Sequence, residues 1–135
     1  MSKIASSTLS LLQTPWAGTI QSGQHAWTID KPQRFGGQDL GPAPYDLLTA
    51  SLASCTMITL RMYAQHKNIS LPEFKVDVDF FANAEGEEWI KRRLYFQQEI
   101  ADDLQHKLLA ICQKTPVTKT LLRSVRIDTT LQIES

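Results

Sequence analysis

The sequence predicts an α+β fold with a largely antiparallel sheet, and two observations carry this prediction. Strand-like and helix-like segments are grouped along the chain: a hairpin, a long helix, a second pair of strands, two short helices and a last strand. Within each pair, the strands are joined by a short turn, as antiparallel neighbours are. We expect one domain over residues 1–135, because single domains are commonly about 100–150 residues long.

The first part of the chain predicts a hairpin and then an irregular loop. Residues 16–29 contain two short runs with Thr, Ile and Trp, and these runs flank Ser22-Gly23, a dipeptide typical of turns. Residues 31–44 are rich in Gly and Pro, which indicates a loop between the hairpin and the next element.

Residues 45–67 predict a long helix that is buried on several sides. Pro44 and Asp46 favour a helix start, and Lys67-Asn68 favour its end. No charged residue occurs between Asp46 and Arg61, and apolar residues cover most of the helix circumference. We therefore expect a central helix that is covered by sheet or by a partner subunit.

The next segment predicts a second pair of strands. Residues 73–81 alternate regularly between apolar and polar side chains, whereas residues 88–99 alternate less regularly. Residues 84–87 form the turn between the two strands.

The last part of the chain predicts two helices and a strand. Residues 102–113 have the spacing of an amphipathic helix. Pro116 favours the first turn of a short helix over residues 116–124. Alternation resumes over residues 125–133, where we expect the last strand.

Composition argues against several classes of protein. The 14 basic residues balance the 14 acidic ones, and no basic block occurs, which argues against nucleic-acid binding. The N-terminus lacks the apolar run of a signal peptide, and no stretch has the roughly 18 apolar residues of a membrane span. We expect a soluble, cytoplasmic protein that does not bind a membrane.

Two cysteines, Cys55 and Cys112, are the candidates for thiol chemistry. In a reducing compartment a permanent disulfide is uncommon, whereas a transient redox pair is permitted. The alternative is that both are buried free thiols that pack as small hydrophobic side chains.

Two segments together resemble the OsmC/Ohr hydroperoxide-reductase superfamily. Residues 41–60, GPAPYDLLTASLASCTMITL, resemble its central-helix signature, in which a Gly- and Pro-containing start leads to small residues and a reactive cysteine. Residues 115–122, TPVTKTLL, resemble the segment that carries the second cysteine of the family. The two motifs agree with the family in order and spacing, and the resemblance is closest to the OsmC-like branch.

The resemblance implies an OsmC-like fold, in which mostly antiparallel sheets wrap around the long buried central helices of an intertwined homodimer. It also implies reduction of organic, lipid-like hydroperoxides without a metal or other cofactor. Cys55 would attack the peroxide and become a sulfenic acid, and a second cysteine would condense with it to a disulfide. A dithiol reductant such as dihydrolipoamide would restore both thiols.

The thiol of Cys55 needs an activating cation from outside its own helix. Only the thiolate is nucleophilic, and the helix dipole fades after the first turn, which Cys55 lies well beyond. Arg61 falls on the opposite side of the helix, and His66 is about 16 Å away along it. In the family an Arg, held by a Glu, supplies the charge, and our candidate is Arg34 in the preceding loop. The alternative interpretation is that Arg34 is a loop residue that lies in solvent and has no role at the site. The other candidates for the activating cation are Arg92, Arg93, Arg123 and Arg126.

Two positions depart from the family pattern. Tyr45 stands where the family has the Glu that holds the Arg, and the adjacent Asp46 either takes that role or is simply a first-turn carboxylate favoured by the helix dipole. Thr115 stands where the family has the second cysteine, and Cys112 lies one helical turn earlier. Cys112 is therefore either a displaced resolving cysteine or a buried core thiol.

These departures leave more than one functional hypothesis. The first is a thiol peroxidase for organic hydroperoxides that depends on Cys55. The second is a non-enzymatic OsmC-like dimer that binds a small apolar ligand. A third class is a Cys/His hydrolase, but no motif places His25, His66 or His106 beside Cys55.

Overall fold

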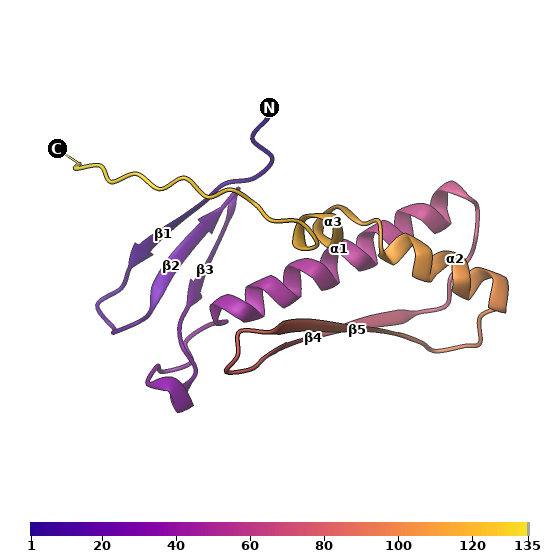
Figure 1. The fold of residues 1–135 in the computed structure, drawn as a ribbon, viewed down its shortest axis with the longest axis horizontal. Coiled ribbons are helices and arrows are strands. Elements are labelled where there is room, and N and C mark those ends of the chain that lie inside the picture. The colour runs from indigo at the N-terminus through magenta and orange to yellow at the C-terminus, as the bar shows by residue number, and fades with distance from the viewer. Residues whose placement is uncertain (135) are drawn as a thin grey trace. The chain divides into compact units, whose positions relative to one another are not determined.

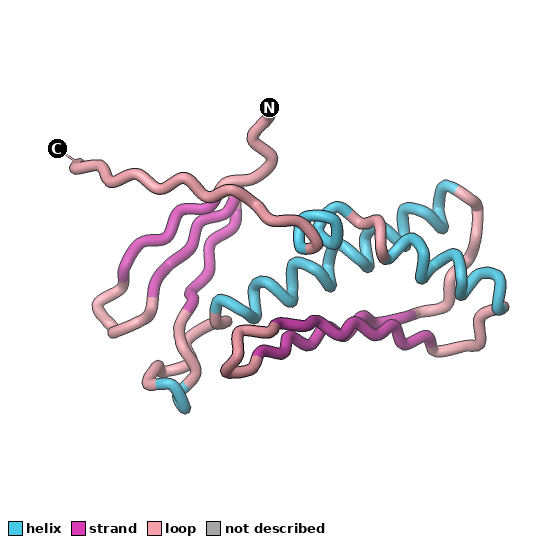
Figure 2. Tube along the Cα trace, viewed as in Figure 1, coloured by secondary structure: helices cyan, strands magenta, loops and turns pink. Residues whose placement is uncertain are grey.

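A computed structural model describes residues 1–134 of the chain, as two compact units. The first unit comprises Met1–Ala50 and Phe80–Trp89, and the second comprises Ser51–Asp79 and the chain from Ile90 onward. The elements, in chain order, are β1 (Ser7–Leu11), β2 (Gly18–Ser22), β3 (His25–Ile29), the 3-10 helix η1 (Gln33–Phe35), α1 (Pro44–His66), β4 (Phe74–Ala82), β5 (Glu88–Phe96), α2 (Asp102–Cys112) and α3 (Pro116–Leu121) (Figures 1 and 2).

The predicted α+β class with antiparallel strands is confirmed. The expected hairpin is β2 and β3, the long helix is α1, and the second strand pair is β4 and β5. The two short helices are α2 and α3.

In the first unit, β1, β2 and β3 lie side by side as an antiparallel sheet (Figure 1). Leu11 pairs with Gly18 across β1 and β2, and Gly18 pairs with Ile29 across β2 and β3. Gly23 lies in the turn between β2 and β3 with a φ of 58°, a conformation that glycine adopts without strain. The sequence did not predict β1, whose five residues are all exposed, because its strand conformation is fixed by pairing with β2 rather than by a buried face.

A buried carboxylate organises the Gly- and Pro-rich loop after β3. Asp30 is 1% exposed. Its oxygens accept the backbone N–H groups of Lys31, Gln38 and Leu40 at 2.7, 3.1 and 3.3 Å. Burial acts to raise the pKa of Asp30, but these three N–H groups together hold it below its ordinary value.

Replacing Asp30 by Asn is expected to loosen residues 31–40. The amide keeps one acceptor oxygen but turns an NH2 group toward backbone donors, so at least one of the three bonds is lost. Amide hydrogen exchange of the loop should accelerate in Asp30→Asn, whereas exchange in β2 should not change. Asp39→Asn is the matched control, because Asp39 is an exposed carboxylate of the same loop.

The same bonds predict a pH dependence of the loop. Because the folded-state pKa of Asp30 is lowered, its stabilising contribution is present above the unfolded pKa of about 3.9 and is lost as the pH falls through the folded value. The protection of residues 31–40 against exchange, measured relative to the intrinsic exchange rate at each pH, should therefore fall in acid in the parent protein, and Asp30→Asn should lack this step. Equal exchange of the loop in the parent and in Asp30→Asn at neutral pH would contradict the role of the carboxylate.

Gly41, the first residue of the central-helix motif, lies directly against β3. A Cβ atom at Gly41 would overlap the carbonyl oxygen of Thr28, so this close approach requires glycine. The N–H of Asp30 donates to the carbonyl of Pro42 at 3.3 Å, which continues the contact. The Gly-Pro start of the motif thus fixes where the chain leaves the sheet.

In the second unit, α1 and α2 share a hydrophobic core with the β4–β5 hairpin. Leu60 is fully buried, and Leu108 and Cys112 are each 2% exposed. The rings of Phe74 and Phe96 stack at 4.9 Å at the start of β4 and the end of β5. Other half-buried side chains pack around this core: Tyr63, Leu71, Leu94, Ile100, Leu104 and Ile111.

Within one chain, α1 is buried on one stripe rather than on several sides. Four residues at intervals of one turn are buried, namely Leu52, Thr56, Leu60 and Ala64. Ile58 and Met62, on another side of the helix, are 51% and 64% exposed. By length and composition alone α1 could cross a membrane, but a core helix of a soluble protein passes the same test.

The predicted strand over residues 125–133 is wrong. Residues 124–134 contain no helix or strand, and α3 ends at Leu121 rather than at residue 124 (Figure 2). The alternating pattern is real, because Val125, Ile127, Leu131 and Ile133 lie at positions of one parity. They are 63–85% exposed, and no strand of the described chain pairs with this segment.

Candidate functional site

The four predicted site residues are divided between the two units. Arg34 and Asp46 belong to the first unit, whereas Cys55 and Cys112 belong to the second. Both cysteines are free; Cys55 is partly exposed on α1, and Cys112 is buried at the C-terminal end of α2.

Arg34 and Asp46 each have local partners in the first unit. The guanidinium of Arg34, in η1, lies over the ring of Phe35 at 4.8 Å. The Oδ2 atom of Asp46 accepts the backbone N–H of Ala43 at 2.9 Å, one residue before Pro44 opens the helix. This is the acidic half of a capping box.

The described chain does not bring Arg34 and Asp46 together. The ion pairs among residues 1–134 are Arg93 with Asp79 and Arg126 with Asp128. Within the described chain, Asp46 makes the contact of a helix-start carboxylate, and its role toward an arginine stays a prediction.

A polar cluster in the second unit forms around Arg92. Its Nη1 donates to the hydroxyl of Thr56 at 2.9 Å and to that of Thr118 at 3.0 Å. Its Nη2 donates to the carbonyl oxygen of Cys112 at 2.9 Å. One side chain from β5 thus joins α1, α3 and the end of α2. We call the set Arg92, Thr56, Cys112, Thr115 and Thr118 the Arg92 cluster.

Each hydroxyl proton of the Arg92 cluster has one acceptor. Thr56 donates to the carbonyl of Leu52 at 2.7 Å, and Thr118 donates to that of Cys112 at 2.9 Å. Because a hydroxyl has one proton, Thr115 must be the donor in its 2.6 Å contact with Thr118 Oγ1. Thr115 also accepts the N–H of Thr118 at 3.2 Å and so caps α3. Thr115, where the resemblance of residues 115–122 places the second cysteine of the family, thus supplies a hydroxyl that caps α3 and donates to Thr118.

Arg92 interrupts the inward face of β5. Every second residue of β5 points to the same face of the strand as Arg92, and the apolar residues on that face are half-buried: Ile90, Leu94 and Phe96. Tyr95, on the other face, is exposed. This explains why residues 88–99 alternate less regularly than 73–81. A charged residue at an apolar position could have distinguished Arg92, which the sequence analysis named only among the alternatives to Arg34.

Cys112 has the surroundings of a core thiol in the described chain. Burial raises the pKa of its thiol, and the positive charge of Arg92 acts in the opposite direction without cancelling the effect. The thiol is therefore protonated at neutral pH. Cys112 packs in the hydrophobic core with Leu60 and Leu108.

Three members of the Arg92 cluster, namely Arg92, Cys112 and Thr118, line a cavity of about 560 Å³. That volume falls within the range of about 300–1,000 Å³ that is typical of small-molecule sites. Arg92, Cys112, Gln113 and Thr118 contribute to its lining. The other lining residues are apolar, namely Leu52, Ile90, Leu94, Leu109, Leu121 and Leu122.

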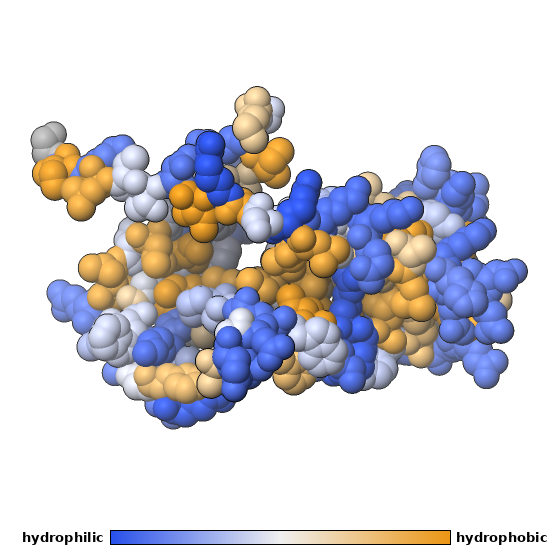
Figure 3. All heavy atoms as spheres, viewed as in Figure 1, coloured by the Kyte–Doolittle hydropathy of each residue, from blue (hydrophilic) through white to orange (hydrophobic). Residues whose placement is uncertain are grey.

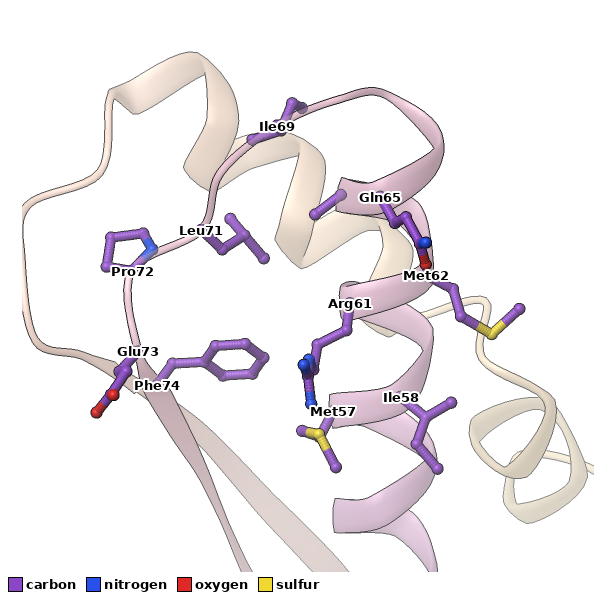
Figure 4. A pocket seen from close by; sticks show the side chains of 11 residues that line it. Met57, Ile58, Arg61, Met62, Gln65, Ile69, Leu71, Pro72, Glu73 and Phe74 are labelled. Carbon is purple, nitrogen blue, oxygen red and sulfur yellow. The ribbon is translucent and has the colours of Figure 1, made fainter.

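A second cavity of about 850 Å³ lies between the C-terminal half of α1 and residues 69–74. Figure 4 shows Met57, Arg61 and Phe74 pointing toward one another in it, while Ile58 and Met62 lie on the side of α1 away from Phe74. Cys55 lines neither this cavity nor the one at Arg92. Residues 1–134 contain no group of three His, Cys, Asp or Glu side chains that could hold a metal ion.

Comparison with known proteins places the chain in a family. The model of the family described as OsmC-like protein matches residues 36–130. The uncharacterized protein YmaD of Bacillus subtilis (strain 168) is 23% identical over 127 residues, which cover 87% of this chain and 83% of that protein.

Solved structures share the fold at low identity. A protein of Psychrobacter arcticus 273-4, named for osmotic stress induction and detoxification response, has a TM-score of 0.75 and 22% identity, with 89% of this chain and 90% of that chain covered. The organic hydroperoxide resistance protein OhrB of Bacillus subtilis has a TM-score of 0.58 and 20% identity, with 87% and 90% covered. The order of the elements and the two motifs, together with the match over residues 36–130, show that this chain belongs to the OsmC-like protein family.

Proposed function

We propose that the protein is a thiol peroxidase that reduces organic, lipid-like hydroperoxides through Cys55. The observation that carries the proposal is the place of Cys55, a free and partly exposed thiol within the central-helix motif on α1. The family match over residues 36–130 supports it. So does the fold that this chain shares with proteins named for organic hydroperoxide resistance.

In the proposed first step, the thiolate sulfur of Cys55 attacks the terminal oxygen of the hydroperoxide. The O–O bond breaks, the alkoxide takes a proton and leaves as an alcohol, and Cys55 becomes a sulfenic acid. The sulfur loses two electrons and the peroxide gains them.

The second step needs a thiol that reaches the sulfenic acid. Thr115, at the second-cysteine position, has a hydroxyl and forms no disulfide. Cys112 has its sulfur in the core and its carbonyl bound to Arg92 and Thr118. We therefore favour a cycle in which an external dithiol, such as dihydrolipoamide, attacks the sulfenic sulfur, releases water and then closes to a cyclic disulfide as it leaves. In the alternative cycle, Cys112 leaves the core and forms the disulfide with Cys55.

The cation that activates Cys55 belongs to the same proposal. Arg34 stays our candidate, because its guanidinium has no carboxylate partner among residues 1–134. Arg92 is the alternative, since it binds the hydroxyl of Thr56, the residue after Cys55.

We also propose that the protein is a cytoplasmic homodimer that binds neither nucleic acid nor membranes. Ile58 and Met62 are exposed apolar residues one turn apart on α1, and a partner subunit could cover them. The C-terminal segment carries four exposed apolar residues of one parity, and Figure 3 shows apolar side chains at the surface along it. An unpaired alternating segment of this kind suits strand addition to a second copy of the chain.

The chemistry is tested directly by the mass of Cys55 after reaction with cumene hydroperoxide. We expect one added oxygen atom on the Cys55 peptide, or its trapped sulfenic-acid adduct, and none on the Cys112 peptide. A loss of two hydrogen atoms with Cys55 linked to Cys112 would instead show that Cys112 resolves the intermediate. If Cys55 stays unmodified while the hydroperoxide persists, the peroxidase proposal fails.

The second candidate function is a non-enzymatic OsmC-like dimer that binds a small apolar ligand. The presence of Thr115 at the second-cysteine position and the apolar cavity beside Arg92 favour it. Native mass spectrometry of the purified protein separates the candidates, because a retained ligand together with an unreactive Cys55 supports the binder.

A further inference from the structure

Arg92 carries a positive charge that no carboxylate of the described chain neutralises. Its three hydrogen-bond partners are two hydroxyls and a carbonyl, all of them neutral. Its neighbour Arg93 differs, because it pairs with Asp79 at 2.6 Å and donates to the hydroxyl of Tyr95 at 3.0 Å. Buried charges are ordinarily paired, and the half-buried guanidinium of Arg92 has only neutral partners in the described chain, so it can accept a counter-ion.

One edge of the Arg92 guanidinium is unoccupied. The Thr118 hydroxyl donates a hydrogen bond to the carbonyl oxygen of Cys112. Thr118 Oγ1 also accepts a hydrogen bond from Nη1 of Arg92, and the Cys112 carbonyl accepts one from Nη2. These two acceptors therefore occupy the end of the guanidinium where Nη1 and Nη2 point forward. The second Nη1 hydrogen goes to Thr56. Of the five N–H donors, this leaves Nε–H and the other Nη2–H, which point the same way along one side.

The Nε atom on that free edge is not fully buried. No buried side-chain nitrogen or oxygen of the described chain lacks a hydrogen-bond partner. Because Nε of Arg92 has no such partner among residues 1–134 and Arg92 is only half-buried, Nε must be accessible. Arg92 lines the 560 Å³ cavity, whose other walls are mostly leucine and isoleucine.

We propose that this cavity binds a monocarboxylate with an apolar body, such as a medium-chain fatty acid, and that its carboxylate sits on the free edge of Arg92. Two parallel N–H donors match the two oxygens of a carboxylate. The apolar walls match a hydrocarbon chain. The site does not depend on Cys55, so it holds whether or not the protein reduces peroxides.

The donor inventory favours a carboxylate over a phosphate or sulfate. The hydroxyl protons of Thr56, Thr115 and Thr118 are already committed to acceptors. Among the described residues, the cavity lining contains no second arginine or lysine. A single guanidinium with two free N–H donors neutralises the one negative charge of a carboxylate and binds both of its oxygens. A phosphate dianion at the same place would keep one negative charge without a cation and at least one oxygen without a hydrogen-bond donor.

The test compares decanoate with decanol by isothermal titration calorimetry on the full-length protein. The two probes share the hydrocarbon chain and differ in the carboxylate, so the parent protein should bind decanoate about 10- to 100-fold more tightly. Arg92→Gln should bring decanoate down to the affinity of decanol. Arg93→Gln is the matched control, because it removes the same charge from the adjacent residue and should leave decanoate binding unchanged.

A second variant keeps the test decisive if Arg92→Gln does not fold. Leu109 lines the cavity but lies outside the Arg92 cluster, and it is 57% exposed. Leu109→Trp should narrow the cavity and weaken both probes, whereas Cys55→Ser should change neither. Equal affinity of decanoate and decanol for the parent, no binding of decanoate, or undiminished decanoate binding in Arg92→Gln or Leu109→Trp would each overturn the proposal.

Discussion

Cys55→Ser is expected to lower kcat/KM for cumene hydroperoxide by about a thousand-fold or more, to the background rate. Removing the nucleophile of a covalent mechanism has effects of this size or larger. A serine hydroxyl is not ionised at neutral pH and does not attack a peroxide oxygen. Because Cys55 is partly exposed and serine has nearly the same shape, the fold should be retained. Loss of hydroperoxide in a dihydrolipoamide-coupled assay measures the effect.

Cys112→Ala is the matched control for that experiment. It removes the other thiol but leaves the backbone carbonyl that Arg92 and Thr118 bind. If an external dithiol reduces the sulfenic acid, Cys112→Ala keeps its turnover, whereas a resolving role for Cys112 predicts a large loss. Equal turnover by Cys55→Ser and the parent would rule out Cys55 as the nucleophile.

Local signals in the sequence were enough to predict the helices and the β4–β5 hairpin. Pro44 fixes the first turn of α1, and Asp46 accepts the N–H of Ala43 at its start, so the predicted boundary at residue 45 is within one residue of the observed one. Pro116 marks the start of α3 in the same way. These features depend on residues within a few positions of one another, which a sequence displays directly.

Features that depend on distant partners were not predictable in this way. β1 is a strand because β2 pairs with it, although its own residues are all exposed. Residues 125–133 show the pattern of a strand but find no partner edge within the described chain. Alternation of apolar and polar residues indicates which face of a strand would be buried. Whether the segment forms a strand depends on hydrogen bonding to a neighbouring strand.

The Arg92 cluster shows the same limit for the candidate site. Arg92 and Thr56 are separated by 36 residues in the sequence, and their 2.9 Å contact exists only in the folded unit. The second motif alone identified Thr115 as a departure from the second cysteine. That its hydroxyl caps α3 and donates to Thr118 required the geometry. Asp46, by contrast, has a local partner, and its helix-start role was one of the two roles that the sequence predicted for it.

The pair Ile58→Asp and Met62→Asp is expected to convert the proposed dimer into monomers. The two side chains are 51% and 64% exposed in the single chain and lie one turn apart on α1. Covering each in an interface contributes about 1.5–3 kcal/mol. Their replacement by carboxylates should therefore weaken association by about 100-fold or more. Light scattering coupled to size-exclusion chromatography, over a range of concentrations, measures the mass.

The matched control places two aspartates one turn apart on α2, at exposed His106 and Ala110. This variant should keep the mass of the parent protein. A parent that is monomeric at every concentration, or an Ile58→Asp/Met62→Asp protein that stays dimeric, would contradict the proposed interface.

The peroxidase activity of the same α1 variant bears on the origin of the activating cation. Both substitutions leave the Cys55 thiol in place, although Ile58 lies one helical turn from it on α1. No carboxylate of residues 1–134 pairs with Arg34. If Arg34 of a second copy activates Cys55, the monomeric variant should lose turnover although its thiol is intact. If turnover persists in the monomer, the cation must come from the same chain. Arg92, which already binds the residue next to Cys55, is then the first candidate.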